Sequence, residues 1–275
     1  MALFVASLNS GSNGNCYYIG NQDEAILIDG GISCRETERR MKRLELPISK
    51  VKAIFVTHEH SDHIYGVPRL SKRHKLPVYI TDNTLKNGRL HLKAEYTVHF
   101  KAYQPIQIGG LTVIPFPKFH DASDPHSFIV SGNDVNIGVF TDIGRSCEHV
   151  VKHFEQCHAA FLEANYDEMM LETGSYPLSL KKRIRDGHGH LSNTEALQLF
   201  MNHRPPFMSH LFLSHLSRNN NSPRIVRDLF KKIAGRTEIV IASRDKETDV
   251  YQIRNLPGRV FKPILPDAQA QLSLF

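Results

Sequence analysis

The chain has 275 residues, of which 41% are hydrophobic and 23% charged, a balance typical of a globular protein that buries a full core. This composition excludes a disordered chain, and the length excludes a miniature scaffold. The formal net charge of +6 weakly favours a polyanionic partner. No apolar run approaches the roughly 20 residues that cross a bilayer, and the first residues lack the features of a signal peptide. We therefore expect a cytoplasmic protein with no membrane partner.

Short apolar runs predict antiparallel β-structure at the start of the chain, over residues 2–8, 16–20 and 25–28. Residues 32–46 predict a mostly charged surface helix with Ser33 as its N-cap. Residues 52–56 predict a buried strand that leads directly into a histidine-rich segment. Ligands and catalytic groups favour this position, just past the carboxyl end of a strand.

The rest of the chain alternates between predicted strands and helices. The strands cover residues 77–81, 111–116, 127–131, 135–141, 211–214, 238–242 and 250–253. The helices cover residues near 146–157, 178–186, 192–203 and 222–234. Ser192 and Glu195 form a capping-box pattern, and Ser222 precedes Pro223 at another helix start. We expect a layered α/β fold that forms one domain over residues 1–255, followed by a flexible tail over residues 256–275.

The strongest local signal is the segment His58-Glu59-His60-Ser61-Asp62-His63. Two histidines separated by one residue in an extended loop can point toward one metal ion, and the Asp-His pair that follows can turn toward a second ion. The alternative is a solvated loop with incidental histidines. Two ions with three or four protein ligands each require further donors downstream, so the rest of the chain decides between the two interpretations.

Such donors recur where predicted strands end. His120, Asp142 and His215 each follow an apolar run. The residues therefore indicate a two-metal hydrolytic site. Zinc and manganese both suit this set of imidazole and carboxylate donors, and iron and magnesium stay open.

These residues, in this order, resemble the signature of the metallo-β-lactamase fold superfamily, which has an early Asp, then His-x-His-x-Asp-His, a His, an Asp and a final His. The resemblance spans residues 1–255 and implies an αβ/βα four-layer sandwich of two mixed β-sheets flanked by helices. It implies that one metal ion is held by His58, His60 and His120. It implies that the other is held by Asp62, His63 and His215. Asp142 would bridge the two ions, and Asp29 would support the metal-binding loop without binding metal.

Several segments resemble one part of that superfamily, the bacterial YycJ/WalJ group. They are Ser10 to Cys16, His120 to Ala122, Leu162 to Asn165 and His215 to Asn220. Members of that group are regarded as metal-dependent 5′ to 3′ DNA exonucleases linked to mismatch repair. The resemblance therefore implies a DNA substrate and a bridging hydroxide between the two ions as the nucleophile.

The residues by themselves indicate only metallohydrolysis. A small-molecule metallohydrolase that acts on a thioester, lactam or cyclic nucleotide stays open, as does an RNA-processing nuclease, because one fold supports many substrates. A non-enzymatic adaptor that keeps metal only for stability is disfavoured by the intact set of donors.

Protonation of the leaving group requires an acid, because a bound hydroxide supplies only the nucleophile. The segment from Gly189 to Ala196, followed by His215, resembles the His-Ser-Thr helix start and metal histidine of tRNA-processing members of the superfamily. This resemblance suggests His190 as the acid, with Glu163 orienting it or adjusting its pKa. The alternative is that His190 merely precedes the predicted helix over 192–203.

Several polar residues are candidate substrate contacts. The candidates are Ser12, Asn13, Ser192 and Asn219. The turn from Ser10 to Asn15 is either an anion-binding nest or a plain hairpin turn. A basic run forms either contacts to the phosphate backbone or a solvated helix face, and its members are Lys181, Lys182, Arg183 and Arg185. His126 is expected on a surface loop outside the site.

The chain ends in Gln271-Leu272-Ser273-Leu274-Phe275, which resembles the Gln-Leu-x-Leu-Phe peptide that bacterial replication and repair proteins insert into the sliding clamp. We expect the apolar residues Leu272, Leu274 and Phe275 to enter a groove while Gln271 hydrogen-bonds at its rim. The alternative is a terminal strand that folds back on the protein itself.

Overall fold

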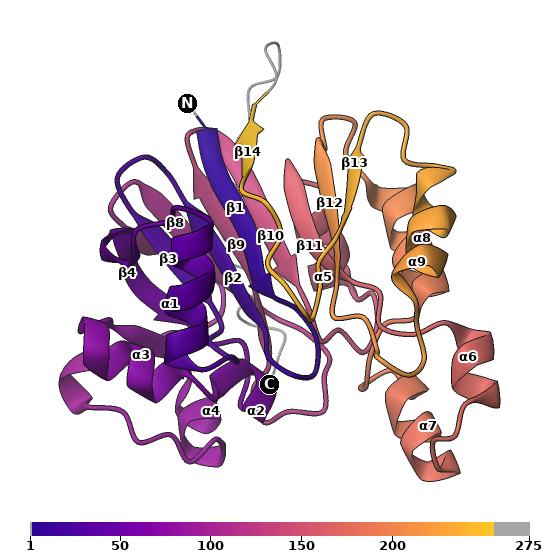
Figure 1. The fold of residues 1–275 in the computed structure, drawn as a ribbon, viewed down its shortest axis with the longest axis horizontal. Helices are drawn as coiled ribbons and strands as arrows, with labels where there is room; N and C mark the ends of the chain where they lie inside the picture. The colour runs from indigo at the N-terminus through magenta and orange to yellow at the C-terminus, as the bar shows by residue number, and fades with distance from the viewer. Residues whose placement is uncertain (1, 256–275) are drawn as a thin grey trace.

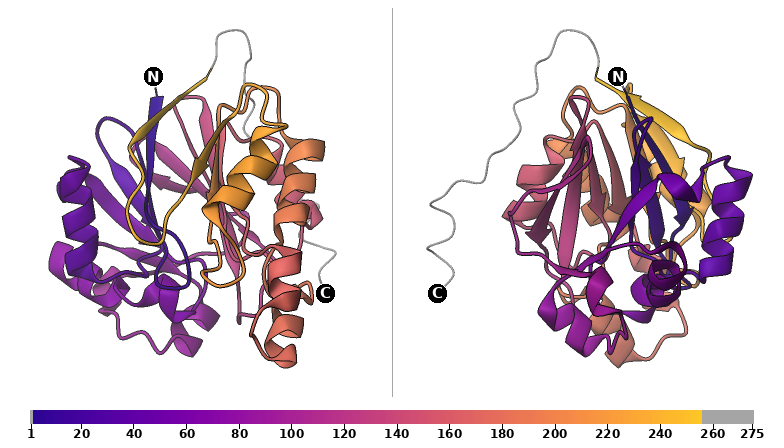
Figure 2. Two further views of the ribbon diagram at one scale, coloured as in Figure 1. Left: turned by 45° about the vertical axis from the view of Figure 1, so that its right-hand side comes forward. Right: turned by 90° about the vertical axis from the view of Figure 1, so that its left-hand side faces the viewer.

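The computed structural model describes residues 2–255, so the predicted tail and its clamp motif lie outside the described residues. Within residues 2–255, two seven-stranded mixed sheets face each other, and helices cover the outer face of each sheet (Figure 1, Figure 2). The predicted α/β class and the four-layer sandwich are confirmed. None of the helices in this range is long and apolar enough to span a membrane.

The first sheet has the strand order β14-β1-β2-β3-β4-β5-β6. Its strands are β1 (Ala2–Asn9), β2 (Cys16–Gly20), β3 (Ala25–Ile28), β4 (Val51–Phe55), β5 (Val78–Ile80), β6 (Thr97–His99) and β14 (Tyr251–Arg254). Strands β1, β2 and β3 are antiparallel neighbours, as the sequence predicts. Strands β3 to β6 run parallel, so their carboxyl ends lie at one edge of the sheet.

The second sheet has the strand order β13-β12-β11-β10-β9-β8-β7. Its strands are β7 (Ile106–Ile108), β8 (Leu111–Pro117), β9 (His126–Gly132), β10 (Val135–Phe140), β11 (Ala159–Glu163), β12 (His210–Ser214) and β13 (Glu238–Ile241). Strands β10 to β13 run parallel. Strand β9 is antiparallel to both β8 and β10, so β8 also ends at the same edge as β10.

Helices pack on the outside of both sheets (Figure 1). The α-helices are α1 (Cys34–Arg43), α2 (Ser61–Ile64), α3 (Val67–His74), α4 (Asp82–Asn87), α5 (Glu148–Phe154), α6 (Glu168–Thr173), α7 (Leu178–Arg185), α8 (Asn193–His203) and α9 (Pro223–Lys231). Short 3₁₀ helices cover Ile48–Lys50 and Ala94–Tyr96. The predicted N-caps Ser33, Ser192 and Ser222 are confirmed, because each hydroxyl accepts a hydrogen bond from a backbone N–H in the first turn.

Aromatic side chains join the two sheets across the central layer. Phe55 of β4 contacts Phe128 of β9 with ring centroids 5.6 Å apart. Tyr17 of β2 contacts Phe161 of β11 at 4.8 Å. Burying one such ring stabilises the fold by about 1.5–3 kcal/mol, so this layer fixes how the edges of the two sheets meet. Two further apolar clusters hold the helices on the outer faces.

The structure corrects two expectations from the sequence and adds strands that were not expected. The helix expected over 32–46 covers only Cys34–Arg43, and it is not a purely surface helix, because Arg40 is buried and donates to the Leu8 carbonyl oxygen at 2.8 Å. His126 is also buried, as the first residue of β9, and its ring packs edge-on against Phe100. A surface position for His126 was therefore wrong. Strands β6, β7 and β11 were not predicted.

Candidate metal centre

The candidate ligands and Asp29 lie just past the carboxyl ends of strands from both sheets. Asp29 follows β3 and the segment from His58 to His63 follows β4. From the second sheet, His120 follows β8, Asp142 follows β10 and His215 follows β12. The central layer brings the two edges together, and the predicted donors form two adjoining groups, each within bonding reach of one ion.

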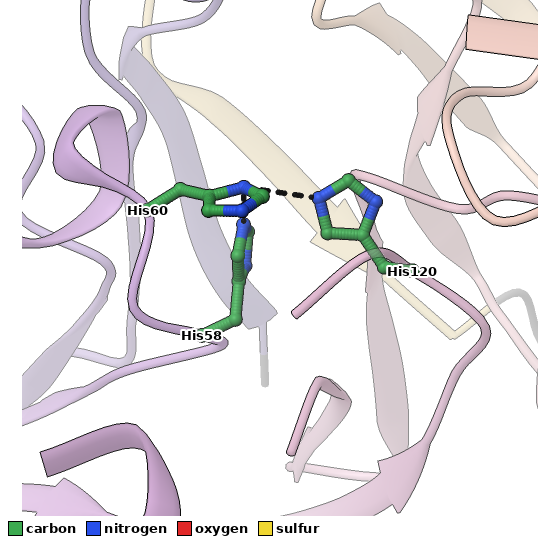
Figure 3. Close-up of side chains that lie close together, drawn as sticks. All are labelled: His58, His60 and His120. Atoms are coloured by element: carbon green, nitrogen blue, oxygen red, sulfur yellow. Dashed lines mark hydrogen bonds between the residues drawn. The ribbon is translucent and has the colours of Figure 1, made fainter. Parts of the chain in front are cut away.

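Three histidine nitrogens form the first group (Figure 3). Nε2 of His58 lies 3.0 Å from Nδ1 of His60, and that Nδ1 lies 3.2 Å from Nε2 of His120. Tetrahedral zinc with Zn–N bonds of about 2.0–2.1 Å separates its ligand nitrogens by roughly 3.3 Å. The spacing therefore fits one ion. Nδ1 of His120 donates to the Gly189 carbonyl oxygen at 2.9 Å, which fixes this ring with Nε2 toward the other two.

Asp29 orients the ring of His63 without belonging to either group. One carboxylate oxygen of Asp29 lies 2.6 Å from Nδ1 of His63, and the other accepts from the Thr57 backbone N–H at 2.8 Å. Nε2 of His63 is thereby directed toward the donors. Gly31 allows the metal-binding loop to pack this closely, because a Cβ there would collide with the Asp62 carbonyl oxygen.

The second group is formed by Asp62, His63 and His215. Nε2 of His215 lies 3.4 Å from Oδ2 of Asp62. Asp142 lies between the two groups, with Oδ2 at 3.0 Å from Nε2 of His63 and Oδ1 at 3.8 Å from Nε2 of His120. Asp142 therefore contacts both groups.

The chemistry of these donors fits a divalent cation. Oδ2 of Asp142 is buried, and within residues 2–255 it makes no hydrogen bond of ordinary geometry, although Nε2 of His63 lies 3.0 Å away. A buried carboxylate oxygen normally has a well-aligned partner or binds an ion. Carboxylate oxygens and neutral imidazole nitrogens are the ligands that zinc and manganese accept. The fold and this cluster together support binding of divalent metal.

Burial and neighbouring charges shift the protonation of the cluster. Burial lowers the pKa of His58 well below its usual range and that of His120 to about 3, so both rings are neutral, as metal binding requires. Burial alone would raise the pKa of Asp142, but His215 and His63 hold it well below its usual range. Burial would lower the pKa of His63, but Asp142 and Asp29 raise it to about 10. A divalent cation would supply the positive charge that the proton on His63 supplies, and its binding would release that proton.

His190 and Glu163 lie beside the second group. Nδ1 of His190 is 2.7 Å from Oε1 of Glu163, which is fully buried, whereas the His190 side chain is 24% exposed. The His190 ring stacks on that of His215 with centroids 5.3 Å apart. Burial would raise the pKa of Glu163, but His190 lowers it, so the carboxylate is charged and holds one side of the ring. The other nitrogen of His190 stays available to a substrate.

The four candidate substrate contacts differ in their surroundings. Ser12 and Asn13 are exposed on the turn that precedes β2. Asn219 is exposed and its amide donates to the Tyr176 hydroxyl at 3.1 Å. Ser192 is buried, and its hydroxyl already caps α8.

Sequence reasoning missed two polar residues that contact the site. Lys118 is buried, and its Nζ donates to the carbonyl oxygen of Thr141, the residue before Asp142, at 2.6 Å. Asn15 lies with Nδ2 3.0 Å from Nε2 of His63. Lys118 lies two residues before His120 in the chain, and this position was a weak indication that it lies near the site. Nothing in the sequence connects Asn15 with the histidine segment.

Three site residues have a left-handed backbone that residues other than glycine rarely adopt. The φ angles are 61° at Asp29, 53° at Asp142 and 55° at His215. Asp29 and His215 directly follow β3 and β12, and Asp142 lies two residues after the end of β10. Backbone strain of this kind concentrates at functional sites.

Comparisons with known proteins agree with this geometry. A family model described as the metallo-beta-lactamase superfamily matches residues 10–158. The chain is 34% identical over 231 residues to Exodeoxyribonuclease YycJ of Bacillus anthracis, which covers 82% of this chain and 87% of that protein. It is 29% identical over 219 residues to Exodeoxyribonuclease WalJ of Streptococcus pneumoniae, which covers 78% and 81%.

Among solved structures, the metallo-beta-lactamase fold protein YhfI from Bacillus subtilis superposes with a TM-score of 0.70 over 92% of this chain and 100% of that one. At 17% identity this likeness supports the fold alone. The family model covers more than half of the chain, and the likeness to YycJ extends over most of it. The chain belongs to the metallo-β-lactamase superfamily, as a YycJ/WalJ-like metal-dependent hydrolase.

Proposed function

We propose that this hydrolase is a dinuclear phosphodiesterase that degrades DNA from the 5′ end, with one catalytic domain over residues 1–255. The observation that carries the proposal is the pair of adjoining donor groups with Asp142 between them and His190 beside them. Two ions about 3.5–4 Å apart suit the in-line cleavage of phosphodiesters. The names of YycJ and WalJ as exodeoxyribonucleases favour DNA over a small substrate.

The proposal assigns the metal-binding residues to two ions and gives His190 and Glu163 separate roles. One ion would be held by His58, His60 and His120, and the other by Asp62, His63 and His215, and Asp142 would be shared between them. When bound, the two ions would lower the pKa of a water molecule and neutralise the phosphate oxygens. His190 donates its Nδ1–H to Glu163 and presents Nε2 to the leaving oxygen. Because Glu163 fixes the orientation of the ring, Nε2 of His190 can deliver a proton to the leaving oxygen as the ester bond breaks.

The proposal extends to repair of DNA mismatches in the cytoplasm and to a partner, the bacterial sliding clamp. The support for the clamp is the fit of the final five residues to the clamp-binding peptide, in which Gln271 is followed by Leu272, Leu274 and Phe275. A clamp would hold the enzyme at sites of DNA synthesis, because a second attachment raises the local concentration of substrate.

The test is a parallel assay of duplex DNA labelled at the 5′ or the 3′ end, single-stranded DNA, RNA and a chromogenic phosphodiester. We expect mononucleotides to be released from the 5′ end of DNA, and an Asp142→Asn variant serves as the control for contaminating nucleases. Release of mononucleotides from the 3′ end would contradict the proposed 5′ to 3′ polarity. Cleavage of RNA with no cleavage of DNA would contradict the substrate, and cleavage of the chromogenic diester alone would favour a small-molecule hydrolase.

A further inference from the structure

A basic groove opens beside the metal centre. It is a hollow of about 590 Å³ between the turn before β2, the loop after β12, the start of α9 and the loop after β13. Four cationic side chains line it: Arg218, Arg227, Arg244 and Lys246. We call these residues and the hollow they line the basic groove.

The four cations are not neutralised by the protein. Within residues 2–255, none of their side chains has a hydrogen bond or ion pair, and Asp245 is the one acidic residue that lines the groove. Nearby arginines outside the groove are paired, since Arg43 binds Glu247 at 2.5 Å. Cations gathered in a concave surface reinforce one another's field and attract a polyanion.

The groove is connected to the metal centre through the turn from Ser10 to Asn15. Ser10 lines the groove, and its hydroxyl accepts from the His215 backbone N–H at 2.8 Å. At the other side of the turn, the Asn13 amide donates to the Arg244 carbonyl oxygen at 2.9 Å. Leu216, the residue after His215, also lines the groove. An anion bound in the groove therefore lies next to a metal ligand.

The other basic regions are less suited to this role. On α7, Arg183 and Arg185 are paired with Asp121 and Glu172, and Lys181 is buried with its Nζ on a backbone carbonyl oxygen. Of the basic run predicted there, only Lys182 has no partner within residues 2–255. A second basic hollow beside α3 is lined by no residue that adjoins a proposed metal ligand in the chain, whereas Leu216 of the basic groove adjoins His215.

We infer that the basic groove binds the phosphate backbone of the DNA strand and guides it to the metal centre. This inference rests on the proposed function. No aromatic residue lines the groove, so bases have no side chain on which to stack. Binding is therefore by charge, which makes it independent of base sequence and sensitive to salt.

The test compares the double variant Arg218→Ala/Arg227→Ala with wild type and with a matched variant, Lys152→Ala/Arg236→Ala. Arg218 and Arg227 are exposed and without partners in the described range, so their removal should not impair folding. Lys152 lies on α5, and Arg236 precedes the amino-terminal end of β13, whereas the groove lies at the carboxyl end of that strand. Neither residue lines the groove. Both double variants lose two positive charges, so they differ only in where on the protein these charges are removed.

Binding of a phosphorothioate-linked single-stranded oligonucleotide to the metal-loaded enzyme is measured by fluorescence anisotropy at several salt concentrations. Loss of two phosphate contacts should weaken binding roughly tenfold or more at low salt and reduce the slope of log K against log[salt] by about 1.4. The KM for DNA should rise while hydrolysis of a chromogenic phosphodiester stays unchanged. The matched variant should behave as wild type.

Three results would overturn the inference. If wild type cleaves DNA and the groove variant binds with an unchanged salt slope, the groove is not the binding surface and the proposed function stands. If both double variants weaken DNA binding equally, the net charge of the protein rather than the groove is responsible for the binding. If wild type cleaves the chromogenic diester but neither binds nor cleaves DNA, the proposed function fails together with this inference.

Discussion

One oxygen of Glu163 contacts two histidines: Oε1 lies 2.7 Å from Nδ1 of His190 and 3.3 Å from Nδ1 of His215. The other oxygen accepts from the backbone N–H of Ile143, the residue after Asp142, at 2.6 Å. A single buried carboxylate thus orients the proposed acid and a proposed metal ligand. Changes at Glu163 should therefore affect both functions, whereas changes at His190 should separate them.

The His190→Ala variant should keep its metal and lose most of its turnover. Its proposed task is proton donation, which is typically worth about 10² to 10⁴-fold in rate. Metal content is measured by mass spectrometry and kcat on DNA by release of label. A substrate with an acidic phenol as leaving group should be cleaved with a smaller loss, since it needs no proton. Loss of metal in this variant would instead make His190 a ligand.

The purified protein should contain about two divalent ions per chain, and His60→Ala should lower this content and abolish hydrolysis. His60 contacts the nitrogens of His58 and His120 at the site, so the fold should be retained. Chelation of wild type should lower its Tm, because an ion that binds only the folded state stabilises it. Circular dichroism spectra of the variant and of wild type show whether the variant is folded. Full activity in protein shown to hold no metal would refute the mechanism.

Protonation of His153 should destabilise the fold as the pH falls. This ring is buried on α5 and stacks on Phe116 at 4.1 Å, and burial lowers its pKa from 6.5 to about 4. The folded state therefore binds fewer protons than the unfolded state between these values, so stability is full above pH 6.5 and falls toward pH 4.

A His153→Phe variant provides the comparison, because it keeps an aromatic ring and cannot be protonated. Between pH 7.5 and 4.5, wild type should lose roughly 2–3 kcal/mol more unfolding free energy than the variant. Urea unfolding at the two pH values measures this difference. Equal losses in both proteins would show that His153 does not contribute to acid sensitivity.

Deletion of residues 271–275 should leave cleavage of short duplexes nearly unchanged and remove binding to a bacterial sliding clamp. The active site is formed by residues that precede the tail, whereas the apolar anchors of the peptide lie within it. Surface plasmon resonance with immobilised clamp measures binding. Replacement of Leu274 and Phe275 by alanine should have the same effect as the deletion. Unchanged binding after deletion, or no binding by the intact chain, would refute the clamp proposal alone.

Much of the site's location could be predicted from the sequence. His120, Asp142 and His215 each end an apolar run, and the carboxyl ends of parallel strands meet at one edge of a sheet. What the sequence could not indicate is which distant segments pair. Strand β11 has the sequence Ala-Ala-Phe-Leu-Glu, without a β-branched residue, and follows α5 closely, so its composition did not favour a strand.

The surroundings of single charged residues were the least predictable feature. Arg183 resembles any solvated helical arginine until the fold brings Asp121 beside it. Arg218 and Arg244 are distant in sequence and line one groove only because β12 and β13 are neighbours. Burial of Lys118 and His126 likewise depends on tertiary packing, which composition and periodicity do not report.

The left-handed backbone at Asp29, Asp142 and His215 also limits how the site can change during evolution. A residue with an ordinary Cβ costs about 1–2 kcal/mol in this conformation, whereas glycine, asparagine and aspartate accept it more readily. Alanine at these positions would combine two defects, the loss of a side chain that the site uses and a strained turn. A relative that abandons catalysis but keeps its fold should therefore pass through asparagine or glycine at these three positions, and such replacements would identify inactive members of the family.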